Sequence, residues 1–236
     1  MACIKVIKRI LTGCECIDRN TDGILAESVT LIYGEPETGK TTMAMQCAVN
    51  CAMQDNKTFF VDCDNTFSAK RLSQIASGKF EEIADLIVLI KPNDFREQIA
   101  VIDRLSDYIE KNFGLVVIDT VTSLYGVRVA ELSGKAFGLN RELNRQMAIL
   151  AQVAKTQKIP VVVTSQVRSV FNEANVSVAP VATRVLSFWA DTIIAMKPTE
   201  NSRIIKAVLE KTPKRAKEIT CHLKIEETGI HDFTFH

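Results

Sequence analysis

The sequence lacks the features that mark several large classes of protein. Its 29 Lys and Arg residues nearly balance 28 Asp and Glu residues, so a formal net charge of +1 gives no global field that would attract nucleic acid. No apolar run approaches the roughly 18 residues of a membrane-spanning helix, and the apolar stretch near the N-terminus is too short for a secretory signal. We therefore expect a soluble, cytoplasmic protein with no membrane contact, in which any affinity for nucleic acid comes from local patches.

Cysteine and histidine do not form a recognisable pattern either. The seven cysteines are an odd set without a C-x-x-C pair, and the three histidines show no spacing typical of metal ligands. The sequence therefore indicates neither a disulfide framework nor a zinc site. We interpret most of the cysteines as small core residues in a reducing compartment.

The distribution of apolar residues predicts the fold class. Apolar runs alternate with amphipathic stretches along a chain of 236 residues, which is typical of one α/β domain (residues 1–236) with a mostly parallel sheet between helices. The expected strands are 29–33, 58–63, 86–90, 115–118 and 161–164, and the expected helices are 41–53, 69–76, 95–112 and 140–156. Three later segments without long helices between them (191–196, 203–209 and 219–225) predict an antiparallel C-terminal extension.

An octapeptide after the first expected strand carries the clearest chemical signal. Residues 34–41, GEPETGKT, match the G-x-x-x-x-G-K-[ST] loop that cradles nucleotide phosphates, and helix formers follow as that motif requires. Lys40 would reach the β- and γ-phosphates, and the hydroxyl of Thr41 would sit on Mg²⁺. The expected cofactor-binding residues are Gly34, Glu35, Pro36, Glu37, Thr38, Gly39, Lys40, Thr41 and Thr42.

Polar residues at the ends of other expected strands complete a catalytic constellation with Lys40. Asp119 ends an apolar strand and would hold Mg²⁺ together with Thr41. Asp64 is the better candidate for activating water, while Gln166 could hydrogen-bond the γ-phosphate and report its presence to the following loop. We interpret Asp62 as a strand-end turn residue.

The order of these motifs resembles the ATPase core of the RecA/RadA recombinase family. The segments that carry the resemblance are 34–41, 61–67, 117–119, 145–147 and 163–167, preceded by Thr12-Gly13 and Ile17-Asp18. It covers essentially the whole chain and is greatest for short archaeal paralogues of RadA that lack its N-terminal helical DNA-binding domain. The resemblance implies a RecA-like P-loop ATPase with ATP and Mg²⁺ as cofactors, acting as a DNA-binding accessory protein in homologous recombination and DNA repair. The partners it implies are single-stranded DNA, a RadA-type recombinase, a Holliday-junction nuclease and further copies of the chain.

Departures from the family pattern predict a slow enzyme. Asp64 stands where recombinases carry a glutamate, and a carboxylate displaced by about 1 Å can lose on the order of 10²-fold in rate. Ala182-Thr183 replaces a glycine pair in the second DNA-binding loop, and Gly126 replaces an arginine in the first. We therefore expect weak ATP hydrolysis, without filament formation or strand exchange of the usual kind.

Two segments without a clear pattern, 125–138 and 168–183, follow strand ends where ligands bind in open α/β sheets. By resemblance they contain the DNA-binding loops, with Arg128, Lys135, Arg168 and Arg184 as contacts. The denser cationic run 211–217 is interpreted either as a solvated hairpin or, at Lys211, as a contact with a neighbouring copy's nucleotide. We interpret Phe188-Trp189 as packing at a sheet edge.

Two alternatives remain open. A KaiC-like signalling ATPase would act on protein partners and not on DNA, but it would favour paired glutamates where this chain has Cys63-Asp64. A non-catalytic scaffold with structural ATP is equally compatible with the motifs. Hydrolysis under single-turnover conditions, with and without single-stranded DNA, separates the three functions.

Overall fold

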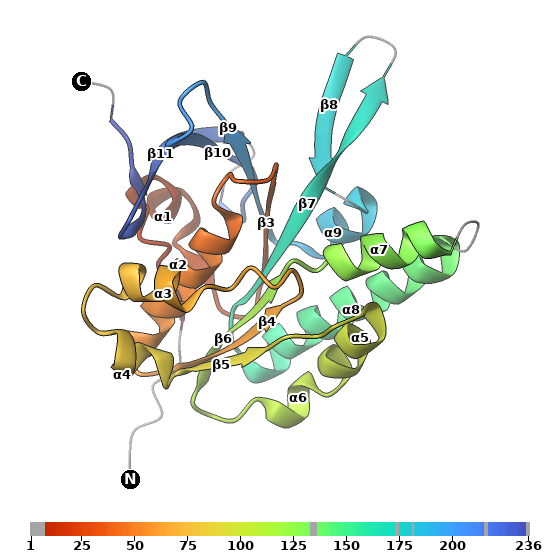
Figure 1. Ribbon diagram of the computed structural model, residues 1–236, viewed down its shortest axis with the longest axis horizontal. Helices are drawn as coiled ribbons and strands as arrows, with labels where there is room; N and C mark the ends of the chain where they lie inside the picture. Colours follow the sequence, from red (N-terminus) through yellow and green to blue (C-terminus); the bar gives the residue numbers. More distant parts are fainter. Residues whose placement is uncertain (1–7, 133–135, 173–174, 181, 215–216, 235–236) are drawn as a thin grey trace.

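A single mixed sheet organises the computed structural model, which describes residues 8–132, 136–172, 175–180, 182–214 and 217–234. Within these residues the strand order is β12-β11-β10-β9-β3-β7-β6-β4-β5, and β8 pairs with β7 alone. The ribbon in Figure 1 shows helices on both faces of this sheet. The predicted α/β class, with a mostly parallel sheet and an antiparallel C-terminal extension, is confirmed.

The parallel part of the sheet contains the five strands predicted from apolar runs. They are β3 (Val29–Gly34), β4 (Lys57–Asp62), β5 (Ile87–Ile90), β6 (Phe113–Asp119) and β7 (Val161–Asn172). Successive residues of a strand point to opposite faces, so Leu31 and Tyr33 enter one apolar cluster while Ile32 enters the other. Burial on both faces explains why these strands read as continuous apolar runs.

The helices divide between the two faces, with α1 to α4 on one side and α5 to α9 on the other (Figure 1). Their bounds are α1 (Glu15–Thr21), α2 (Lys40–Ala52), α3 (Ala69–Ala76), α4 (Phe80–Ala84), α5 (Phe95–Asp103), α6 (Leu105–Tyr108), α7 (Ser123–Glu131), α8 (Ala136–Gln157) and α9 (Thr183–Trp189). The helix predicted over 95–112 is wrong in extent, because the chain breaks at Arg104 into two short helices.

The C-terminal strands are β9 (Thr192–Pro198), β10 (Ile204–Lys211), β11 (Ile219–Glu226) and β12 (Gly229–Asp232). β9 runs parallel to β3, and β10, β11 and β12 then follow as antiparallel neighbours. A small pair, β1 (Arg9–Ile10) and β2 (Ile24–Leu25), lies outside the main sheet. The extension therefore becomes antiparallel one strand later than its first predicted segment.

The two segments without a sequence pattern are ordered elements. β7 continues well past residue 164 and forms an antiparallel hairpin with β8 (Asn175–Pro180), which projects from the sheet in Figure 1. Helix α7 and the beginning of α8 occupy the described residues of 125–138.

A disulfide joins Cys16 and Cys221, a pairing that the sequence analysis did not indicate. It joins α1 to β11 across a sequence separation of 205, with 5.8 Å between the Cα atoms. The fold brings these residues together, so their spacing in the sequence carried no signal. The other described cysteines, Cys14, Cys47, Cys51 and Cys63, are free and buried, as expected of core residues.

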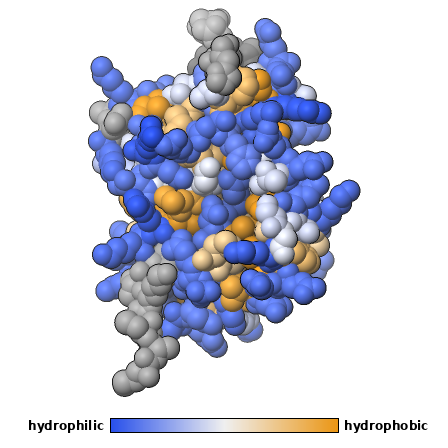
Figure 2. All heavy atoms as spheres, turned by 90° about the vertical axis from the view of Figure 1, so that its left-hand side faces the viewer, coloured by the Kyte–Doolittle hydropathy of each residue, from blue (hydrophilic) through white to orange (hydrophobic). Residues whose placement is uncertain are grey.

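The surface that carries α1, α3 and the C-terminal strands is mainly hydrophilic, with separated apolar patches (Figure 2). Among the described residues, no helix is both long enough and apolar enough to cross a membrane.

Candidate nucleotide-binding site

The phosphate-binding motif lies between β3 and α2, the context that its sequence predicts. At Gly34 a side chain has no room, because a Cβ atom would lie 2.1 Å from the carbonyl oxygen of Met196 on β9. The loop closes on itself where the hydroxyl of Thr38 donates to the carbonyl oxygen of Glu35 at 2.8 Å. Gly39, with a φ of 87°, then begins α2. The exposed N–H groups of the first helical turn and its positive dipole end therefore face the loop, as an anion site requires.

Lys40 lies over this loop and close to two carboxylates. Its side chain is largely buried, with the residue 8% exposed, and Nζ donates to the carbonyl oxygen of Glu35 at 2.6 Å. Burial lowers the pKa of Lys40, while the charges of Asp119 and Asp64 act in the opposite direction. The predicted phosphate-binding lysine therefore stands at the centre of the predicted acidic residues.

Asp119 ends β6 as a fully buried carboxylate (0% exposed). Its Oδ1 atom accepts a hydrogen bond from the hydroxyl of Thr164, whereas Oδ2 has no partner among the described residues. Burial raises the pKa of Asp119 to about 6, against the opposing effect of the hydroxyls of Thr164 and Thr41. A buried carboxylate oxygen without a donor, beside the Thr41 hydroxyl, fits a bound cation.

The described residues contain no group of three or more His, Cys, Asp or Glu side chains that could hold a metal by themselves. Mg²⁺ is commonly bound through one or two carboxylates together with substrate phosphates and waters. Asp119 and Thr41 therefore fit a Mg²⁺ ion that arrives with a nucleotide.

Asp64 and Gln166 meet at the carboxyl edge of the sheet. Oδ2 of Asp64 accepts from Nε2 of Gln166 at 3.3 Å and from the hydroxyl of Thr120 at 3.3 Å. The structure thus joins the two predicted candidates for water activation and phosphate sensing, and places both beside the β6 strand end. Gln166 is exposed, so its amide can exchange this partner for another.

Asp62 has a structural role in shaping the turn that carries Asp64. Its buried carboxylate accepts from the backbone N–H groups of Thr66 and Phe67, each at 3.0 Å, and pairs with Lys91 at 3.3 Å. The interpretation of Asp62 as a strand-end turn residue is confirmed.

A hydroxyl pair that the sequence analysis did not identify connects the site to α7. The hydroxyls of Thr122 and Ser165 share a hydrogen bond of 3.1 Å, and the backbone N–H of Gln166 donates to the Thr122 hydroxyl at 3.4 Å. Thr122 directly precedes α7. A displacement of Gln166 therefore has a direct path to the helix that carries Arg128.

Arg71 on α3 is a second residue that the sequence analysis did not assign to the site. It lines a pocket of about 550 Å³ with Thr42, Arg203, Lys224, Ile225, Glu226 and Glu227. Its guanidinium donates to the carbonyl oxygens of Glu226 and Glu227, at 2.8 and 2.7 Å. Because Thr42 belongs to the first turn of α2, this pocket continues the phosphate loop toward the C-terminal strands. Arg71 lies four residues after the family-like segment 61–67, and the sequence analysis gave it no role.

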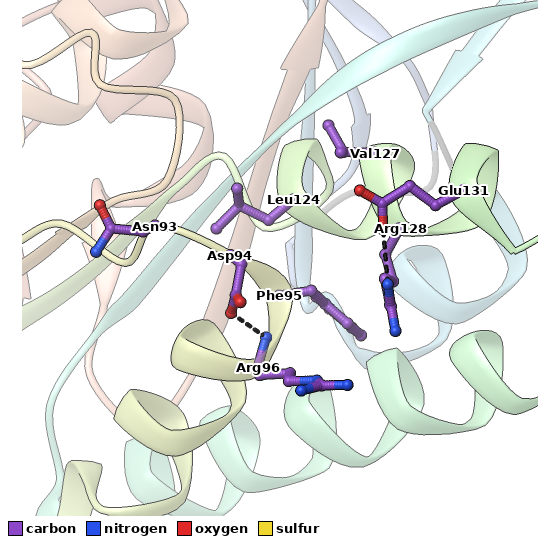
Figure 3. A pocket seen from close by; sticks show the side chains of 8 residues that line it. All are labelled: Asn93, Asp94, Phe95, Arg96, Leu124, Val127, Arg128 and Glu131. Carbon is purple, nitrogen blue, oxygen red and sulfur yellow. Dashed lines mark hydrogen bonds and ion pairs between the residues drawn. The ribbon is translucent and has the colours of Figure 1, made fainter.

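The predicted DNA-binding residues lie on different elements. Arg128 of α7 lines a pocket of about 360 Å³ opposite Asn93 and Arg96 of the α5 entrance, and it pairs with Glu131 at 2.7 Å (Figure 3). Arg184 is exposed at the beginning of α9, and Arg168 lies in the part of β7 that pairs with β8. Lys135 lies outside the described residues.

Lys211 and the aromatic pair 188–189 lie close together at the end of α9. Nζ of Lys211 donates to the carbonyl oxygens of Ala190 and Ser187, at the end of α9 in the same chain. Phe188 is 73% exposed, so the interpretation of this residue as packing is wrong. Trp189 is half-buried and donates to the side chain of Asn144 at 2.9 Å. The short helix turns one ring outward and the other toward α8.

Comparisons with known proteins agree on one family. The Rad51 family model matches residues 4–233. The DNA repair and recombination protein RadB of Methanobrevibacter smithii is 34% identical over 221 residues, 91% of this chain and 92% of that protein. RadB of Thermococcus kodakarensis is 33% identical over 225 residues, 94% and 98% of the two chains. A crystal structure of the RadB recombinase superposes with a TM-score of 0.81 at 30% identity, covering 95% of this chain and all of that one. The chain therefore belongs to the Rad51 family of the RecA/RadA recombinase superfamily, and RadB proteins are among its clear relatives.

Proposed function

We propose that this protein is an ATP-binding, slowly hydrolysing and DNA-binding accessory factor in homologous recombination and DNA repair. The observation that carries the proposal is the orphaned Oδ2 atom of Asp119, buried beside the hydroxyl of Thr41 and the ammonium of Lys40. The names of its RadB relatives, DNA repair and recombination proteins, support the biological setting.

In this proposal the phosphate loop binds the triphosphate through its N–H groups, and Lys40 compensates the charge of the β- and γ-phosphates. Thr41 and Asp119 hold Mg²⁺, which neutralises charge on the phosphates when bound. Arg71 offers a planar guanidinium, already held by two carbonyl groups, on which a purine can stack.

The position of Asp64 supports slow hydrolysis. Its side chain is one methylene shorter than that of a glutamate. Its carboxylate accepts hydrogen bonds from Gln166 and Thr120, and these donors compete with an attacking water molecule for it. When the Gln166 amide turns to a γ-phosphate, it releases Asp64, while the backbone N–H of Gln166 links this strand end to the Thr122 hydroxyl next to α7. The ATP-bound state would then persist and be transmitted to a DNA-binding element.

Single-stranded DNA is the proposed nucleic acid, with Arg128, Lys135, Arg168 and Arg184 contacting phosphates. The exposed Arg184 on α9 and the pocket position of Arg128 on α7 support cationic contacts on two helices that lie on the same face of the sheet. Titration of single-stranded DNA with and without Mg·ATP tests this part of the function, because nucleotide-dependent affinity is expected.

A RadA-type recombinase is the proposed protein partner, with a Holliday-junction nuclease and further copies of the chain as additional ones. An apolar pocket of about 400 Å³ supports docking of a protein segment. It is lined by Phe59, Val88, Ile90, Val101, Tyr108 and Phe113, with the charged Lys57 and Glu110. The pocket adjoins β5, which is the last strand at one edge of the described sheet. An edge strand beside an apolar pocket suits an extended segment that carries one large apolar side chain.

A non-catalytic scaffold with structural ATP is the second candidate, because the carboxylate of Asp64 is already engaged by two donors. Single-turnover hydrolysis of bound ATP, with and without single-stranded DNA, distinguishes the two. Slow but complete turnover supports the accessory ATPase, and retention of intact ATP supports the scaffold.

A further inference from the structure

Helix α2 carries a buried amide that binds the backbone of two distant segments. Gln46 lies one helical turn beyond Thr42 and is 5% exposed. Its Nε2 atom donates to the carbonyl oxygen of Thr12 at 2.7 Å and to that of Ile230 at 3.0 Å. Its Oε1 atom accepts from the N–H of Ile230 at 2.7 Å. A single side chain therefore joins the nucleotide-site helix to residues 34 and 184 positions away.

The Gln46 amide makes the two backbone hydrogen bonds that a neighbouring strand would otherwise make with Ile230. β12 lies at the edge of the described sheet, opposite β5, and its partner Ile225 directs its own N–H to β10. The N–H and C=O of Ile230 are thus free of β11 and exchange two hydrogen bonds with Gln46. The fit is close, because a Cβ atom at Gly229 would lie 2.3 Å from Oε1 of Gln46. Only an amide supplies both the donors and the acceptor that this edge requires.

The Thr12 side of the contact is fixed by Asp18. Its carboxylate accepts from the N–H of Thr12 at 2.8 Å, from the Thr12 hydroxyl at 2.9 Å, and from the N–H of Gly13 at 3.1 Å. This arrangement gives a physical role to the Thr12-Gly13 and Ile17-Asp18 pattern, which presents a rigid carbonyl group to Gln46.

The hairpin held by Gln46 forms a wall of the candidate nucleotide site. The side chains of Ile230 and Ile225 lie 3.0 and 3.2 Å from the position of a Cβ atom on Gly39, in the phosphate loop. At the turn of the same hairpin, the carbonyl groups of Glu226 and Glu227 hold the guanidinium of Arg71. Gln46 is therefore connected to Arg71 through β12 and the hairpin turn, a route that does not include Lys40.

We infer that Gln46 is a positioning residue that sets the base-binding half of the site. It seats the β11–β12 hairpin and, through it, orients Arg71 toward the purine, while Lys40, which is held by Glu35, contacts the phosphates. The inference rests on the proposed ATP binding and assigns binding of the base and binding of the phosphates to different residues. Selection of a nucleoside triphosphate over a bare triphosphate depends on Gln46.

The experiment compares ATP with inorganic tripolyphosphate, both with Mg²⁺, by titration calorimetry on wild type and Gln46→Glu. An ionised glutamate has nearly the shape of glutamine but only acceptors, so it opposes the carbonyl groups of Thr12 and Ile230. We expect ATP affinity to fall about tenfold and tripolyphosphate affinity to change less than about twofold. Gln152→Glu, on an exposed position of α8, is the matched control and should leave both affinities unchanged.

An equal loss of affinity for both ligands would overturn the inference, because it would mean that Gln46 supports the whole loop. So would unchanged ATP affinity in folded Gln46→Glu. If that variant does not fold, Gly229→Ala presses on Oε1 from the opposite side and should cause the same selective loss. Wild-type protein that binds neither ligand contradicts the proposed function itself, whereas ATP binding that is indifferent to both variants contradicts only the role of Gln46.

Discussion

Nε2 of Gln166 donates to Oδ2 of Asp64 at 3.3 Å, although the two residues are separated by 102 positions. The contact binds the proposed phosphate-sensing amide of Gln166 to the proposed water-orienting carboxylate of Asp64, so each group is occupied by the other. Turnover in this protein should therefore depend on how readily Asp64 is released and how far it reaches.

Substitution of Asp64 tests this relationship directly. Asp64→Glu adds one methylene and should raise single-turnover hydrolysis about tenfold or more, because a displacement of about 1 Å matters strongly to a reacting group. Asp64→Asn should keep ATP binding and remove residual hydrolysis. Rates are measured with Mg²⁺ and single-stranded DNA present. Equal rates in all three proteins would exclude Asp64 as the catalytic group.

The pH dependence of stability tests the state of Asp119. Its pKa is raised from 3.8 to about 6 in the folded protein, so ionising it opposes folding. Below about pH 4, Asp119 is protonated in both the folded and the unfolded chain and does not change the free energy of unfolding of the nucleotide-free protein. Above about pH 6, its ionisation lowers that free energy by about 3 kcal/mol. Asp119→Asn removes the cost. The stability of the variant relative to wild type should therefore rise between about pH 4 and pH 7, as measured by urea unfolding.

The same substitution should abolish Mg²⁺-dependent nucleotide binding, since the amide replaces a cation ligand. We therefore expect Asp119→Asn to be more stable than wild type at neutral pH and to gain no stability from Mg·ATP. A variant whose relative stability does not change with pH would contradict a raised pKa for Asp119.

The ion pair between Arg128 and Glu131 allows a test of whether Arg128 contacts DNA. Glu131→Gln removes the charge that pairs with Arg128 at 2.7 Å and should strengthen binding of single-stranded DNA if the guanidinium contacts phosphate. Glu82→Gln, on an exposed position of α4, should have no effect.

Arg184→Ala should weaken binding of single-stranded DNA and lower the slope of log affinity against log salt by about 0.7. Affinity that is insensitive to salt in wild type would contradict phosphate contact.

The disulfide should contribute to stability because it closes a long loop. Reduction of Cys16–Cys221 by a dithiol should lower the free energy of unfolding by roughly 2 to 5 kcal/mol. A Cys16→Ser, Cys221→Ser double variant should match the reduced protein and show no further response to the dithiol. The check is thermal unfolding with and without reductant, and a dithiol effect that persists in the double variant would assign it to another cysteine.

The sequence was most informative where a local pattern and a chemical requirement coincide. The strand, loop and helix around Gly34 to Thr41 and the acidic end of β6 could be predicted, because phosphate and Mg²⁺ binding restrict residue types at fixed spacing. The parallel strands could be predicted because burial on both faces leaves continuous apolar runs.

Contacts that the tertiary fold creates could not be predicted in this way. The Asp64–Gln166 hydrogen bond, the Cys16–Cys221 disulfide and the clamp of Gln46 on Ile230 join residues at least 102 positions apart. The β7–β8 hairpin was missed for a different reason. The apolar run that predicts β7 ends at Thr164, and residues 168–183 show no clear helix or strand pattern.

The central claim is that the phosphate loop binds Mg·ATP through Lys40, and calorimetric titration of wild type and Lys40→Ala tests it most directly. Wild type should bind Mg·ATP, and Lys40→Ala should bind about 10- to 100-fold more weakly while keeping its circular dichroism spectrum, since a charged hydrogen-bond donor is lost. Lys79→Ala, at an exposed position, should bind as wild type does. Equal affinity in wild type and a folded Lys40→Ala variant, or no binding by wild type at all, would contradict the account.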